Sequence, residues 1–165
     1  MLIFEIMKFP KLTIYQKIIE AISLVLVVAT IVTTVILYTK LPDQVPKHFD
    51  INGHVDAWAG KASVFTIPAF GLVMYALFII IMFFPKALKP NTLKPLDMRF
   101  WPQIQQETIS VLAECTLLCV LLFGYMQLFI LMQSPMIVWP VWIICGLMLV
   151  SCFIRMKRLS KYTLK

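Results

Sequence analysis

The sequence predicts an all-α integral membrane protein: a bundle of four spanning helices with both termini cytoplasmic and one structured extracellular loop at residues 40–61. Of the 165 residues, 61% are hydrophobic and only 14% are charged, whereas a soluble domain is about half apolar and a quarter charged. Long uncharged runs alternate with short polar segments, and one such segment, residues 41–61, carries both histidines. The length and composition together indicate a single polytopic domain, residues 1–165, whose solvent is lipid.

The first span is predicted at residues 18–38. Glu20, near its start, is its only charged residue, and about 20 apolar residues suffice to cross the hydrocarbon core. A cleaved signal peptide would have a shorter apolar region of about 7–15 residues, followed by a small-residue cleavage site. This run is longer and ends in Leu-Tyr-Thr-Lys at residues 37–40. We therefore expect a retained helix.

The second span is predicted at residues 62–84, which contain no charge. Pro68 and Gly71 interrupt its first turns, and a bundle tolerates such breaks where neighbouring groups satisfy the freed carbonyls. The following segment, residues 85–107, contains four prolines and is basic. This density of proline predicts no continuous helix there.

The third and fourth spans are predicted at residues 108–132 and 136–154. Residues 115–154 contain no charge, which is about twice the length that one span requires. The sequence Gln-Ser-Pro at 133–135 divides the run near its middle and predicts a tight turn.

The distribution of Lys and Arg predicts the orientation of these spans. With a cytoplasmic N-terminus, twelve of these residues lie in the inner segments and three in the outer ones. The positive-inside rule then places both termini in the cytoplasm of a cell-membrane protein. The net charge of +7 is grouped at the ends of apolar runs, which predicts contact with lipid headgroups and argues against a nucleic-acid partner.

The polar segment at 41–61 is predicted to form a hairpin. Asn52-Gly53 is a two-residue turn signal between short strands at 49–51 and 54–56. We expect Phe49 and Trp58 to fold this loop onto the outer mouth of the bundle. A turn at Asn52-Gly53 would place His48 and Asp50 on one face, and His54 and Asp56 on the other.

No metal or cofactor is predicted. Residues 48–56 overlay part of a calcium-binding loop, but the position that needs a bidentate Glu is Ala59. Zinc held by His48, His54 and a carboxylate would have no helical spacing to support it. The four cysteines lie inside apolar runs, where we expect small buried hydrophobic side chains.

The pattern Leu41-Pro42, Pro46, His48-Phe49, Gly53, Asp56, Trp58 and Lys61 resembles the signature of a bacterial membrane family of unknown-function domains. That family is related to the immunity protein of the sporulation-delaying-protein toxin system (SdpI-like). The resemblance covers roughly residues 15–96, and the toxin-immunity relative has further helices. It implies an immunity or resistance role. From the polar segment itself we expect recognition of an extracellular ligand by the following loop residues: His48, Phe49, Asp50, Asn52, Gly53, Asp56, Trp58 and Lys61.

Three polar side chains are predicted inside the membrane: Glu20, Glu114 and Gln127. The two acids could form a proton or cation relay, or could pair near the headgroups with Lys17, with Arg155 or with each other. We expect Gln127 and the threonines of the first span to join helices by hydrogen bonds.

The sequence thus predicts a small multi-pass membrane protein that recognises an extracellular ligand through residues 41–61, with immunity to a secreted peptide toxin as the implied role. One alternative is a small transporter or accessory subunit that uses an intramembrane Glu and requires a homo-oligomer or a partner chain. Another is a membrane anchor that recruits a cytoplasmic regulator through the basic loop at 85–101. An enzyme is not predicted, since the sequence contains no Gly-rich phosphate loop, His-Glu-x-x-His helix or Gly-x-Ser-x-Gly elbow.

Overall fold

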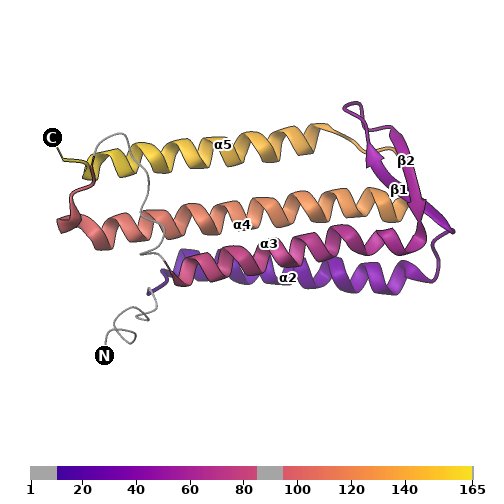
Figure 1. Ribbon diagram of the computed structural model, residues 1–165, viewed down its shortest axis with the longest axis horizontal. Coiled ribbons are helices and arrows are strands. Elements are labelled where there is room, and N and C mark those ends of the chain that lie inside the picture. The colour runs from indigo at the N-terminus through magenta and orange to yellow at the C-terminus, as the bar shows by residue number, and fades with distance from the viewer. Residues whose placement is uncertain (1–10, 85–94, 165) are drawn as a thin grey trace.

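The computed structural model describes residues 11–84 and 95–164. Four long helices lie side by side and a two-stranded hairpin covers one end of them (Figure 1). The elements in chain order are α2 (Ile14–Tyr38), β1 (Gln44–Phe49), β2 (Val55–Gly60), η1 (Lys61–Phe65), α3 (Thr66–Phe83), η2 (Met98–Phe100), α4 (Trp101–Met132), α5 (Trp139–Leu159) and η3 (Ser160–Tyr162). All four long helices are apolar and long enough to cross a membrane. The predicted bundle of four long apolar helices with a small hairpin is confirmed.

The helices are arranged as a three-helix group with a fourth helix beside it. Helices α2, α3 and α4 pack against one another, whereas α5 packs mainly along α4. Figure 1 shows α5 lying apart from α2 and α3. We call the end that carries β1 and β2 the hairpin end. The opposite end, where the described chain starts and stops, is the terminal end.

Helix α2 begins at Ile14, four residues before the predicted start. Thr13 and Gln16 form a capping box: the Gln16 backbone N–H donates to Thr13 Oγ1 at 3.2 Å, and the Thr13 N–H donates to Gln16 Oε1 at 2.8 Å. This pairing satisfies two of the free donors at the start of a helix. A prediction based on the apolar run alone could not include this polar first turn.

Helix α4 begins at Trp101, so the prediction of a non-helical segment up to residue 107 is wrong for residues 101–107. Pro102 lies in the first turn, where the missing N–H has no helical partner to lose. The η2 turn before it is capped by Asp97, which accepts the backbone N–H of Arg99 at 3.1 Å. The predicted basic loop at 85–101 lies largely outside the described residues.

The other two helices also differ from prediction at their ends. The second span opens with the 3-10 turn η1 before α3. Helix α5 runs from residue 139 to 159 instead of 136 to 154. Its longer end carries Arg155 and Arg158, which both lie near Glu107 of α4.

The hairpin has a three-residue loop, so the predicted two-residue turn at Asn52-Gly53 is wrong. The Asp50 N–H donates to the His54 carbonyl at 2.8 Å, and the Gly53 N–H donates to the Asp50 carbonyl at 2.9 Å. Within this loop, Gly53 is the residue with a positive φ, +86°. A turn closed by glycine in the left-handed region is the usual three-residue hairpin connection.

The hairpin is packed onto the bundle through its inner face. Val45 and Phe49 of β1 are buried in one apolar cluster with Val64, Ile130 and Met136. The Met136 N–H, in the connection between α4 and α5, donates to the Gly53 carbonyl at 2.7 Å. This contact fixes the hairpin tip to the helices.

Candidate functional site

The outer face of the hairpin displays three of the predicted site residues. Strand β2 alternates, with Val55 and Ala57 half-buried and Asp56 and Trp58 exposed. His48 of β1 lies on the same side, because its Nδ1 is 2.6 Å from Asp56 Oδ1. Trp58 is 52% exposed. We refer to His48, Asp56 and Trp58 as the hairpin face.

The pairing of His48 with Asp56 contradicts the prediction that these side chains point to opposite faces. The register between the strands shifts on both sides of His48. A bulge of this kind adds a residue to one strand and changes which face the following side chains occupy. Strict alternation of side chains on either side of a two-residue turn therefore does not predict which face His48 and Asp56 occupy.

The remaining signature residues of the loop hold the hairpin in place. Phe49 is buried against the bundle as predicted, whereas Trp58 is not. A Cβ added to Gly53 would lie 1.8 Å from the Met136 carbonyl oxygen, so only glycine fits. Lys61 Nζ lies 4.8 Å from the centroid of the Tyr38 ring, within the range of a cation–π contact.

Asp50 organises the turn through its carboxylate. Its Oδ1 accepts the backbone N–H groups of Asn52 and His54, each at 2.8 Å. These bonds, the one from His54 above all, hold the pKa of Asp50 below its usual range. His54 Nδ1 also lies 3.4 Å from Asp50 Oδ2. The hairpin thus carries two His–Asp pairs, one in the turn and one on the hairpin face.

The histidines and acids of the hairpin do not converge on one point. Within residues 11–84 and 95–164, no three His, Cys, Asp or Glu side chains are grouped so that they could hold a metal ion. The four cysteines are free thiols and are half-buried rather than fully buried. Cys115 and Cys152 have their sulfur atoms 3.8 Å apart.

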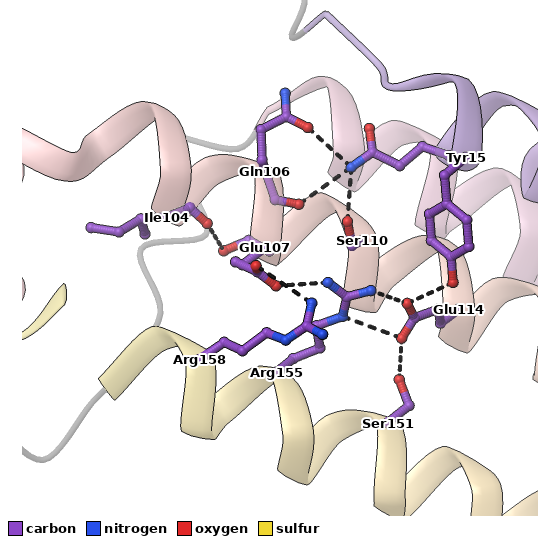
Figure 2. Close-up of polar contacts among 11 residues, drawn as sticks. Tyr15, Ile104, Gln106, Glu107, Ser110, Glu114, Ser151, Arg155 and Arg158 are labelled. Carbon is purple, nitrogen blue, oxygen red and sulfur yellow. Dashed lines mark hydrogen bonds and ion pairs between the residues drawn. The ribbon is translucent and has the colours of Figure 1, made fainter. Parts of the chain in front are cut away.

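A second polar cluster lies between the helices at the terminal end (Figure 2). Arg155 of α5 contacts two acids of α4: its Nη1 lies 2.7 Å from Glu107 Oε2, and its Nη2 pairs with Glu114. Ser151 and the Tyr15 hydroxyl also donate to Glu114, the latter at 2.9 Å. These side chains come from α2, α4 and α5, so the cluster joins three helices. We call it the arginine cluster; its members are Tyr15, Glu107, Glu114, Ser151 and Arg155.

The sequence allowed Arg155 as a partner of Glu114 but gave no role to Tyr15 or Ser151. The spacing of the polar residues along α4 and α5 does, however, indicate that these helices meet through polar faces. Glu107 and Glu114 are seven residues apart, and Ser151 and Arg155 four apart, so each pair lies on one helix face. Two complementary polar stripes on neighbouring helices would have indicated the contact.

Gln16 forms a further polar link between α2 and α4. Its Nε2 donates to Ser110 Oγ at 2.9 Å and to Gln106 Oε1 at 3.1 Å. Gln106 in turn donates to the Lys11 carbonyl at 2.9 Å. This link lies beside the arginine cluster (Figure 2).

Gln127 joins helices near the hairpin end, as predicted. Its Nε2 donates to Thr34 Oγ1 at 3.0 Å and to the Val64 carbonyl at 3.1 Å. Gln127 is 1% exposed. The hydroxyls of Thr30 and Thr34 return to carbonyls of their own helix at 2.8 Å, so Gln127 makes the link between elements.

Glu20 differs from Glu114. It is 8% exposed, and neither of its carboxylate oxygens has a hydrogen-bond partner within the part of the chain that the structure describes. The partners suggested by sequence, Lys17, Arg155 and Glu114, make no ion pair with it. No hydrogen bond therefore joins the two acids within the described residues.

A groove of about 350 Å³ opens between α2, α4 and α5. Its lining is almost entirely apolar and includes Leu26, Val120, Gly124 and Leu128. Such a surface suits lipid chains and offers little to orient a polar ligand. The hairpin face is the better candidate for recognition.

Comparison with known families places the hairpin at the centre of a recognised domain. Residues 25–72 match a family described as a domain of unknown function (DUF1648). The match runs from the middle of α2 through the hairpin and η1 into α3. No curated protein and no solved structure matches the chain. The matched unit is thus the hairpin with the two half-helices that carry it.

Proposed function

We propose that this multi-pass membrane protein recognises an extracellular ligand through the hairpin face and acts by binding, without catalysis. The observation that carries the proposal is that different residues of one loop anchor it and face solvent. Phe49, Gly53 and Lys61 hold the hairpin against the helices, whereas His48, Asp56 and Trp58 face outward. Exposed polar and aromatic side chains on a firmly held loop are typical of a binding site.

The chemistry of the hairpin face favours a peptide ligand. An exposed tryptophan offers a large flat surface that contributes much to binding. The His48–Asp56 pair adds a hydrogen-bond donor and a carboxylate next to it. The resemblance to the SdpI-like family supports a secreted peptide toxin as the ligand and immunity as the role.

The proposal places the hairpin outside the cell and both termini in the cytoplasm. This orientation follows from the excess of Lys and Arg at the terminal end. A cysteine introduced at Asn52, which is exposed in the turn, should react with a membrane-impermeant thiol reagent in intact cells. Labelling only after the cells are broken would contradict the orientation.

Protection of sensitive cells tests the function. Expression of the chain should raise the dose of a membrane-active peptide toxin that cells survive, and His48→Ala, Asp56→Ala or Trp58→Ala should remove this protection at equal protein levels. Ile51→Ala is the matched control, because Ile51 is 72% exposed at the hairpin tip and outside the hairpin face. Equal toxin sensitivity with and without the chain, across a panel of peptides, would contradict the proposal.

The two alternative functions have less support. A transporter that uses Glu114 would need a carboxylate free to bind its cargo, whereas Arg155 already neutralises Glu114. An anchor for a cytoplasmic regulator would depend on Lys86, Lys89 and Lys94, which lie outside the described residues. Loss of a co-purifying soluble partner on neutralising these lysines would favour the anchor.

A further inference from the structure

Glu20 is a buried acid without a compensating charge in the described part of the chain. It lies in the second turn of α2, near the terminal end, and 8% of its surface is exposed. Ile19, next to it, packs with Met82 of α3 in an apolar cluster. Both carboxylate oxygens are buried, and neither has a hydrogen-bond partner among residues 11–84 and 95–164.

Among residues 11–84 and 95–164, the charged and titratable groups around Glu20 do not supply a counter-ion. On α2 itself, Lys17 is exposed and makes no ion pair with Glu20. On α3, Tyr75 is close enough to interact electrostatically with Glu20 but carries no positive charge. On α4, Glu107 and Glu114 are both held by Arg155.

An isolated carboxylate in an apolar interior is so poorly solvated that the group takes up a proton instead. We propose that Glu20 is a proton-binding site between α2 and α3, and that the packed arrangement of these helices is the form that carries the proton. The ligand of this site is a proton. The proposal goes beyond ligand recognition at the hairpin and does not depend on it.

The proton would couple pH to helix packing at the terminal end. Ionised Glu20 needs water or a cation, and either would have to enter the contact between α2 and α3. The packed protein then binds more protons than the unfolded chain does, so its stability should fall as pH rises. Glu20→Gln, which is permanently neutral and nearly the same shape, should remove this component of the pH dependence.

Infrared spectroscopy of the full chain in an ester-free detergent at neutral pH tests the proposal directly. The wild-type protein should show the carbonyl stretch of a protonated carboxyl, and Glu20→Gln should lose that band. Glu114→Gln is the matched control: Glu114 is also an acid inside the terminal half, but it is paired with Arg155, so this variant should retain the band.

Glu20→Asp gives a second readout if Glu20→Gln does not fold, since a protonated aspartate in the same place should shift the band rather than abolish it. A wild-type spectrum without a protonated-carboxyl band would overturn the proposal. A band that persists unchanged in the Glu20 variants would overturn it as well.

Discussion

The two ends of the bundle use polar side chains in opposite ways. At the hairpin end, the paired groups are near one another in sequence and open to water: His48 and Asp56 are 68% and 46% exposed. At the terminal end, Arg155 and Glu114 are 41 residues apart and only 14% and 16% exposed. The charged groups at the hairpin end are open to solvent, whereas those at the terminal end form ion pairs that hold helices together.

This difference predicts how substitutions will behave. Exposed ion pairs contribute little to stability, roughly 0–1 kcal/mol. Removing one partner of a buried pair is costly, because the other charge is left uncompensated. Changes on the hairpin face should therefore affect binding at constant stability, whereas loss of Arg155, which both acids share, should lower the stability of the protein.

The largest effect is expected for Arg155→Ala. The change leaves Glu107 and Glu114 half-buried without their shared counter-ion, and should lower the free energy of unfolding by up to about 3 kcal/mol, the lower end of the range for a fully buried pair. Equilibrium unfolding of the detergent-solubilised protein measures the loss. Arg158→Ala is the matched control: Arg158 is 51% exposed and 3.8 Å from Glu107, so its loss should be about 0–1 kcal/mol. Equal losses for the two arginines would refute the contrast between buried and exposed pairs.

Gly53→Ala should have the next largest effect, although it lies at the hairpin end. The new Cβ would overlap the Met136 carbonyl, and the φ of +86° is unfavourable for alanine. We expect a loss of about 1–3 kcal/mol and separation of the hairpin tip from the helices, measured by unfolding and by protease sensitivity of the loop. Gly60→Ala, whose Cβ would meet nothing within 4 Å, should be tolerated. Wild-type behaviour of Gly53→Ala would show that the tip is not fixed to the helices.

The same contrast explains what could be predicted from the sequence. The four spans, the hairpin and the burial of Phe49 follow from local patterns: run length, turn residues and alternation. The start of α4 was missed because four nearby prolines suggested a loop, although Pro102 in a first helical turn costs nothing.

The arginine cluster was mostly missed because its members come from three helices. The spacing of Ser151 and Arg155 marks the face of α5 that meets α4, but no local pattern links Tyr15 of α2 to these residues. The face of His48 was also missed, because a bulge shifts the register and leaves no mark in the sequence as simple as Asn-Gly. Both failures concern pairing between segments.

A smaller effect is expected for the hydrogen bond between Gln127 and Thr34. Both side chains are buried, although they lie near the hairpin end. Polar links between membrane helices average about 0.6 kcal/mol and reach about 1.7 kcal/mol. A double-mutant cycle of Gln127→Ala and Thr34→Val should give a coupling energy in this range, since Gln127 Nε2 lies 3.0 Å from Thr34 Oγ1. Thr33→Val should not couple with Gln127→Ala. Additive effects of the first pair would mean that Gln127 stabilises through packing alone.

The smallest effect concerns the pH dependence of the hairpin turn. Because the backbone N–H groups of His54 and Asn52 hold the pKa of Asp50 below its usual range, the stabilisation is present above the unfolded value of about 3.9. It is lost as pH falls through the lower pKa of the folded turn. Hydrogen exchange at the Asn52 and His54 amides should therefore show loss of protection in acid, and Asp50→Asn should remove that pH dependence. Asp43→Asn, outside the turn, should leave it unchanged. A turn that is equally protected at acid and neutral pH in the wild type would show that the carboxylate does not organise it.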